Sequence, residues 1–236
     1  YYNPQNATLV ICGDINTDKI LKQIEQYFSS ISNQKNKNYK IKNPINFKSG
    51  NRFASFDLNV PSPAVFLAYH CPGFKEEDIY VADVLSFIAG TGRSSRLYKS
   101  LVYKNQIATQ SSSTVDKREL GSLLIFYAIS NNPDISCDKL YKELKIEIEK
   151  FKIKQVLEEE LIKARNQLST EAAYELQYSS GIADILANYT MFWGEPEKIY
   201  SVLDNYKKVN KEDIIQFANK ILVEDNSIRI DAVLKK

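Results

Sequence analysis

The sequence predicts an α+β domain in which a mixed, mostly antiparallel sheet is covered on one side by helices. Short apolar or alternating stretches, typical of strands, lie both early and late in the chain, so the first and last strands can share one sheet. Stretches with helical spacing of apolar residues lie between them. No internal repeat is visible, and 236 residues are enough to enclose one sizeable core. We therefore expect a single α+β domain over residues 1–236.

Composition excludes several classes of function. A net charge of +2 gives no electrostatic reason to expect nucleic acid or an anionic membrane as a partner. No apolar run approaches the roughly 18 residues that span a bilayer, so no membrane span is expected. Cys12, Cys71 and Cys137 lie far apart without metal or redox spacing, and we expect structural thiols.

The first quarter of the chain predicts a strand, a helix and a connector. Residues 7–12, ATLVIC, form a continuous apolar run and predict a buried strand. Asn16 or Thr17 caps the following helix. Its expected apolar face comprises Ile20, Leu21, Ile24, Phe28 and Ile31. Residues 32–51, rich in Lys, Asn and Ser, predict a solvated connector within the domain, and 52–59 and 64–69 predict strands on either side of a proline-bearing break.

Residues 76–115 predict a rigid corner around which the chain is organised. Val81, Val84, Leu85 and Ile88 make one apolar stripe along a helix, and Gly90-Thr91-Gly92 ends it. A second helix restarts at Ser94 or Ser95, whose hydroxyl can cap it. From Ile107 the pattern becomes polar and β-prone, and strands over 106–115 and 121–129 are expected around a turn at 116–119.

The last part of the chain is mainly helical. Asp134 or Ser136 caps a helix to about Lys152, and 154–192 is the longest helical stretch, with a break at Ser179-Ser180-Gly181. Trp193-Gly194-Glu195-Pro196 ends that stretch. Two short helices, near 196–206 and 210–221, lead to a final strand over 227–233.

No independent active site is expected. A zinc peptidase needs three protein ligands, usually with paired histidines around a glutamate, and this chain has one histidine, His70. No G-x-S-x-G element surrounds a serine, and Gly90-Thr91-Gly92 lacks the third glycine of a dinucleotide site. Arg93 and Arg96 can either hold an anion or pair with acidic neighbours. We expect this chain to bind neither a metal nor another cofactor.

Three stretches carry a family resemblance. The run G-T-G-R-S-S-R-L-Y-K-S-L-V at 90–102, followed by Ile107-Ala108, resembles the signature in the second domain of pitrilysin/insulinase-type zinc metallopeptidases, which include the mitochondrial processing peptidases. The opening 3–14 and the helical region 160–196 resemble the same domain. In that family a unit pairs two similar α+β domains, the first holds zinc, and two units enclose a chamber where peptides are cut.

The resemblance implies that this chain is the C-terminal, non-zinc domain of a unit. Zinc is then expected in an N-terminal domain absent from this chain, and residues 1–6 resemble the linker between the domains. Non-zinc halves carry an Arg and a Tyr where this chain has Val102 and Thr109, so the chain is similar to a zinc-bearing half. Expected partners are the zinc-bearing domain, a second unit in a homodimer or heteromer, and a peptide substrate. The intact protein is expected to be a zinc-dependent metalloendopeptidase whose chamber wall this domain forms; the alternative is a non-catalytic core or interaction subunit.

Substrate contact is expected at the corner. An extended peptide can add as a strand to a free sheet edge, because main-chain hydrogen bonds are indifferent to side-chain identity. The residues expected there are Gly90, Thr91, Gly92, Ala108, Thr109, Gln110, Ser111, Ser112 and Ser113. The alternative interpretation is that Ser111–Ser113 are the solvated face of an interior strand.

Overall fold

The structure is a computed structural model that describes residues 3–31, 50, 52–153 and 156–235. Its backbone forms two compact units, one of 1–43 with 169–203 and one of 44–168 with 204–236. The predicted connector at 32–51 lies outside the described residues, apart from Gly50. That the two units form one domain stays a prediction.

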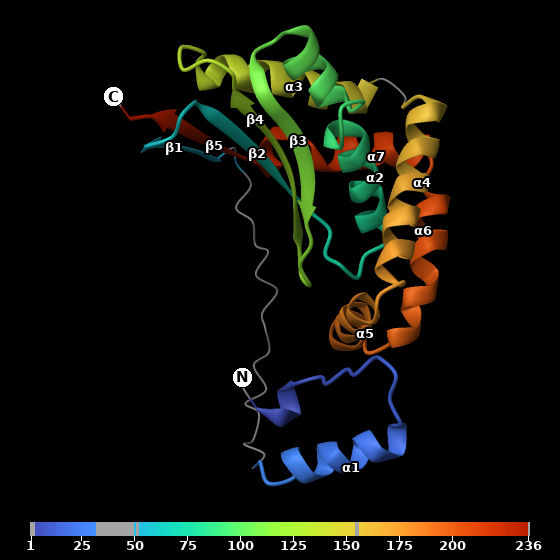
Figure 1. Ribbon diagram of the computed structural model, residues 1–236. Coiled ribbons are helices and arrows are strands. Elements are labelled where there is room, and N and C mark those ends of the chain that lie inside the picture. Colours follow the sequence, from blue (N-terminus) through green and yellow to red (C-terminus); the bar gives the residue numbers. More distant parts are fainter. Residues whose placement is uncertain (1–2, 32–49, 51, 154–155, 236) are drawn as a thin grey trace. The chain divides into compact units, whose positions relative to one another are not determined.

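The second unit is built on a five-stranded sheet. Its strand order is β1 (Arg52–Leu58), β5 (Ser227–Leu234), β2 (Ala64–Cys71), β4 (Ser122–Ser130) and β3 (Ala108–Asp116). β1 and β5 run parallel, and every other neighbouring pair is antiparallel. An early strand and the last one therefore share the sheet, as predicted, and β1 and β3 lie at its two edges (Figure 1).

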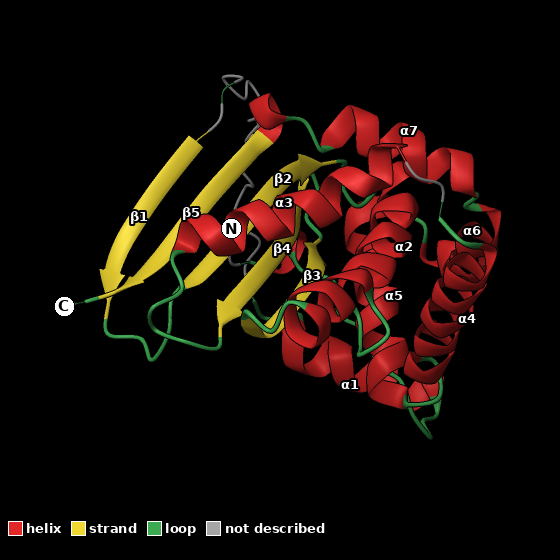
Figure 2. Cartoon of the chain, turned by 90° about the horizontal axis from the view of Figure 1, so that it is seen from above, coloured by secondary structure: helices red, strands yellow, loops and turns green. Residues whose placement is uncertain are grey.

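Helices cover one face of this sheet. α2 (Asp78–Gly90), α3 (Cys137–Ile153) and α7 (Lys211–Ile221) pack on it, as Figure 2 shows from above. Every second residue of β2 and β4 faces these helices, and this set is at most 1% exposed: Val65, Leu67, Tyr69, Leu124 and Phe126. The alternation of strand residues thus defines the core. The predicted α+β class, with helices on one side of a mixed sheet, is confirmed.

The opposite face of the sheet is apolar as well but is not covered to the same extent. Phe56 of β1, Phe66 of β2 and Ile230 of β5 are 52%, 38% and 39% exposed. Tyr127 of β4 is directly opposite Phe66, and their rings stack with centroids 5.8 Å apart. A solvent-facing sheet surface is normally polar in a self-contained domain, so this surface has the composition of an interface.

Local signals explain the helices of this unit. Asn210 and Asp213 form a reciprocal capping box at the start of α7. Ser136 accepts a hydrogen bond from the Lys139 backbone N–H and so caps α3, as its sequence predicted. A π-helix, η2 (Tyr98–Lys104), follows α2, and a short 3₁₀ turn, η4 (Glu224–Asn226), precedes β5. Within the described ranges, no helix has both the length and the apolarity to cross a membrane.

The first unit contains η1 (Pro4–Asn6), α1 (Thr17–Phe28), α5 (Ser179–Trp193) and η3 (Pro196–Ser201). The chain passes from one unit to the other within α4 (Glu158–Glu175), after Leu168, and within α6 (Val202–Lys208), after Leu203. Asn16 caps α1 through Lys19 N–H, and Gly194 ends α5 with φ of 70°. Both ends lie where the sequence predicted them. The long helical stretch does break between α4 and α5, at 176–178, just before the predicted Ser179-Ser180-Gly181, which form the first turn of α5.

One predicted element is wrong. Residues 7–12, expected as a buried strand, form no strand, and Leu9 and Ile11 are 56% and 41% exposed. An apolar run can form a strand only beside another strand that supplies hydrogen-bond partners, and the described residues of the first unit contain none. Hydrophobicity alone predicted burial without identifying that neighbour.

Candidate functional site

The corner between α2 and β3 is closely packed. A Cβ atom on Gly90 would lie 1.9 Å from the backbone nitrogen of Ser113. Ser113 Oγ donates to the carbonyl of Ser86 at 2.7 Å, and Ser112 Oγ donates to the carbonyl of Gly90 at 2.7 Å. The two serine hydroxyls therefore bind carbonyl groups in the last part of α2, and glycine is required at position 90 because β3 occupies the space of a side chain.

β3 is an edge strand of the described sheet, where it pairs with β4. The pairing register jumps from Ala108 to Gln110, so Thr109 forms a β-bulge and has no register partner in β4, although its hydroxyl contacts the carbonyls of Ile129 and Ser130 at 3.4 and 3.5 Å. Thr109 and Gln110 are exposed, whereas Ser111 and Ser113 are only 4% and 7% exposed. The alternative of an interior strand with a solvated serine face does not fit these positions, because the strand lies at the edge of the described sheet and two of its serines are buried.

Gly92 differs from Gly90 in its surroundings. It has φ of 75° and no atom within 4 Å of the position of a Cβ atom. Conformation, not space, therefore favours glycine here. The chain then turns into the second helix, where Ser95 Oγ accepts a hydrogen bond from Tyr98 N–H at 3.4 Å, as the predicted cap requires.

Arg96 pairs with an acidic neighbour. Its Nε and Nη2 atoms donate to the two carboxylate oxygens of Glu160 at 2.9 and 2.6 Å. Burial pushes the pKa of Glu160 upward, but the bonds from Arg96 and from the Leu157 backbone N–H hold it below its usual value. Of the two interpretations of this arginine, the ion pair is the one observed.

Two neighbours of the corner were not predicted. Gln106 has φ of 49°, the single positive φ of a non-glycine residue among those described. Tyr127 accepts a hydrogen bond from Gln110 Nε2 at 2.8 Å, which places an aromatic hydroxyl beside the edge strand. A cross-strand partner depends on sheet register, and the sequence pattern does not give register across a turn.

No metal centre is found in the described part of the chain. It contains no group of three or more His, Cys, Asp or Glu side chains placed to hold an ion. His70 lies at the end of β2, and burial lowers its pKa. Cys71 and Cys137 are buried and free, and burial raises the pKa of Cys71 to about 12. These side chains do not fit a zinc peptidase site, and thiols of this kind are not nucleophiles at neutral pH.

A buried carboxylate links three elements of the second unit. Asp83 of α2 accepts from the hydroxyl of Tyr206 in α6 at 2.7 Å and pairs with Lys117, which follows β3, at 2.6 Å. Burial raises the pKa of Asp83, although both partners oppose the rise. The cluster ties α2 and α6 to the end of β3 and so stabilises the corner.

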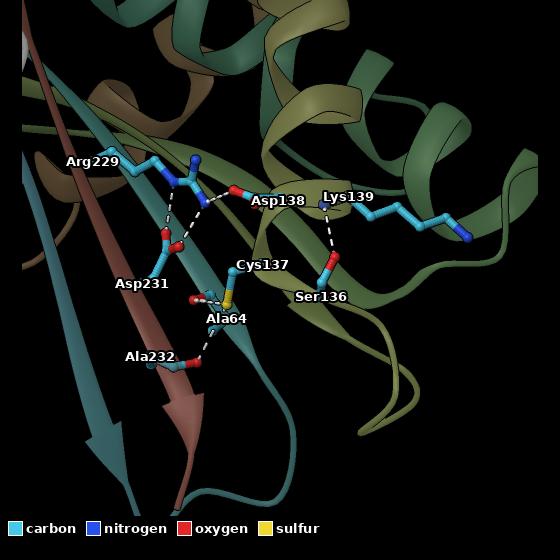
Figure 3. Close-up of polar contacts among 8 residues, drawn as sticks. All are labelled: Ala64, Ser136, Cys137, Asp138, Lys139, Arg229, Asp231 and Ala232. Carbon is cyan, nitrogen blue, oxygen red and sulfur yellow. Dashed lines mark hydrogen bonds and ion pairs between the residues drawn. The ribbon is translucent and has the colours of Figure 1, made fainter.

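A second polar cluster holds α3 against the sheet (Figure 3). Arg229 of β5 donates through Nε and Nη2 to the two oxygens of Asp231, and Nη2 also donates to Asp138. Its guanidinium lies over the rings of Phe53 and Tyr141, 5.1 and 4.3 Å from their centroids. Two carboxylates and two aromatic rings thus contact this guanidinium, so we assign the cluster a structural role.

Comparison with known proteins points to one family. Residues 1–168 match the family described as "Peptidase M16 inactive domain". The chain is 32% identical over 240 residues to an uncharacterized zinc protease of Rickettsia felis and 27% identical over 234 residues to the zinc protease PqqE of Helicobacter pylori. These alignments cover 99% and 98% of this chain but 54% and 52% of the relatives, so the chain spans about half their length.

A solved structure agrees. The crystal structure of a protease from Helicobacter pylori superposes with a TM-score of 0.84 at 26% identity, covering 94% of this chain and 53% of that one. The fold of the described residues is therefore found in a protease about twice as long.

Proposed function

Because the chain belongs to the peptidase M16 inactive-domain family, we propose that it is the peptide-holding wall of a zinc metallopeptidase whose zinc lies in another domain. The observation that carries the proposal is the arrangement of the sheet. The face of the sheet away from the helices is apolar and partly exposed among the described residues, and β3 lies at the edge of the sheet with an exposed bulge at Thr109. A partly exposed apolar face suits a wall that faces an enclosed chamber, and an exposed edge strand suits a peptide that is held by its backbone.

The position of Gly90 limits which part of β3 a peptide can reach. The end of α2 lies against Ser112 and Ser113, so a peptide reaches the edge most easily at Ala108–Ser111. Gly92, in the loop after α2, has open space around it, because no atom lies within 4 Å of its missing Cβ. Loose sequence preference is expected, since the contact is made by main-chain groups.

Zinc is proposed for a domain outside this chain. The curated relatives are named zinc proteases and are about twice as long, which supports an additional domain that carries the metal. Purified full-length protein is expected to contain stoichiometric zinc and to show chelator-sensitive peptide cleavage. A zinc-free, inactive full-length protein would favour the alternative, a non-catalytic core or interaction subunit.

Edge binding is tested by removing one backbone donor. Thr109→Pro deletes an N–H group at the bulge, a position without a register partner in β4, and also removes the long contacts of the Thr109 hydroxyl with the carbonyls of Ile129 and Ser130. Ser55→Pro makes the same change in β1 at the opposite edge and serves as the matched control. In full-length protein with its catalytic glutamate inactivated, we expect Thr109→Pro to weaken binding of an unfolded peptide about tenfold, roughly the loss of one or two hydrogen bonds.

Ser55→Pro is expected to leave the affinity unchanged. Far-UV circular dichroism of both variants checks that the fold survives. An unchanged affinity in folded Thr109→Pro would contradict the edge hypothesis, and weaker binding in Ser55→Pro alone would move the site to β1.

A further inference from the structure

A cleft of about 290 Å³ lies between η2, α3 and the start of α4, apart from the edge of β3. Charged side chains dominate its lining. They are Arg96, Lys99, Lys104, Glu147, Lys150 and Glu160. Four positive groups thus face two negative ones.

Both carboxylates in the cleft are already paired. Glu160 accepts Arg96 through both oxygens and also the backbone N–H of Leu157. Glu147 is 7% exposed and pairs with Lys150 at 2.6 Å. The cleft therefore retains an excess of two positive charges once these pairs are formed.

Lys99 and Lys104 supply that excess. Both are exposed, and neither ammonium group lies within 4 Å of a carboxylate among the described residues, although the charge of Lys99 is near enough to Glu160 to help lower the pKa of that carboxyl. An unpaired ammonium group bordering a cleft is available for an anion from solution, and two such groups favour a ligand with adjacent negative charges.

The π-helix explains why both lysines border one cleft. Lys99 and Lys104 are five residues apart, and in an α-helix such residues point about 140° away from each other. In a π-helix the backbone bonds run from residue i to i+5, so residues five apart lie on nearly the same side. The bond from Asn105 N–H to the carbonyl of Ser100, at 2.8 Å, has this spacing. The π-helix thus places two exposed lysines at one cleft.

We propose that this cleft binds an acidic peptide segment, with successive carboxylates held by Lys99 and Lys104. This binding does not depend on the proposed edge contact, because the residues and the element that carry it are different. The ligand is recognised by charge, so its affinity falls as ionic strength rises.

The test uses full-length protein and two fluorescent peptides, one with four successive glutamates and one with glutamines in their place. We expect the glutamate peptide to bind more tightly, and Lys99→Gln/Lys104→Gln to weaken it about tenfold, as the loss of two exposed ion pairs implies. Lys139→Gln/Lys142→Gln on α3 removes the same charge from exposed positions outside the cleft, and is expected to have no effect. The affinity should also survive Thr109→Pro, which separates this site from the edge of β3.

Three results would overturn the proposal. These are equal affinity for the two peptides, equal weakening by the control pair on α3, and unchanged binding in the Lys99/Lys104 variant. Inorganic phosphate at matched ionic strength is the remaining probe. Saturable phosphate binding without glutamate-peptide binding would make the cleft a site for small anions and would reject the peptide assignment.

Discussion

Substitution of Gly90 by alanine probes the packing at the corner. The added Cβ would lie 1.9 Å from Ser113 N and 2.5 Å from Ser112 C, where real Cβ contacts are not closer than 3.0 Å. Both neighbours are backbone atoms, so α2 and β3 must separate by about 1.1 Å. A displacement of that size stretches two serine-to-carbonyl hydrogen bonds of 2.7 Å beyond bonding distance.

The magnitude follows from these contacts. Two lost hydrogen bonds cost about 1–3 kcal/mol and overpacking about 1–3 kcal/mol, while alanine returns up to about 1 kcal/mol of helix propensity. We expect Gly90→Ala to lower the free energy of unfolding by about 2–4 kcal/mol, measured by urea denaturation with far-UV circular dichroism. Gly92→Asn is the control: this position needs a positive φ but has free space, and asparagine tolerates that conformation, so the loss should stay below about 1 kcal/mol. A loss under about 0.5 kcal/mol for Gly90→Ala would refute the account of the corner.

Three further substitutions test individual features. Gln106→Gly is expected to stabilise the protein by about 0.5–1 kcal/mol, because glycine adopts the positive φ of this position without strain. Gln110→Gly in β3, where φ is not positive, should destabilise the protein, and equal effects of the two substitutions would contradict this reasoning. Asp83→Asn removes a carboxyl whose pKa is raised by burial. The free energy of unfolding of the wild type, relative to this variant, should therefore be highest below about pH 4 and fall as the pH rises through the raised pKa. A difference that does not change with pH would show that the pKa of Asp83 is not perturbed. Arg229→Lys loses the two-pronged contact with the buried Asp231 and should cost about 1–3 kcal/mol in thermal or urea unfolding. Arg118→Lys, where both nitrogens contact one oxygen of the more exposed Asp116, should have no measurable effect.

Local signals in the sequence predicted most of the second unit. In β4 the apolar alternation of Leu123, Ile125, Tyr127 and Ile129 marks the half-exposed face, whereas the intervening Leu124, Phe126 and Ala128 are buried; both faces of this strand are apolar, so alternation alone does not identify the core face. The apolar stripe of α2 does place buried side chains correctly, because its periodicity follows directly from helix geometry. The same holds for Ser136 and Gly194, which act within one turn of the backbone. These features need no knowledge of distant residues.

Features that depend on distant partners were missed. The run at 7–12 has the hydrophobicity of a buried strand, yet strand formation depends on a neighbour. The hydrogen bond between Gln110 and Tyr127 depends on sheet register, and the π-helical winding that places Lys99 beside Lys104 depends on backbone bonding that residue spacing does not reveal. The sequence therefore predicted which residue types lie at the proposed sites, but not how distant elements bring those residues together.

Amide hydrogen exchange of β3 in the full-length protein, with and without an uncleaved peptide, tests the central claim most directly. If a peptide adds to the edge strand, the backbone N–H groups within Ala108–Ser111 that point away from β4 gain hydrogen-bond partners and exchange more slowly in its presence. The amides of β1, at the other edge, should be unaffected. Protection confined to β1, or no change in β3 at a peptide concentration that saturates the protein, would contradict the assignment of this chain as the wall that holds the peptide.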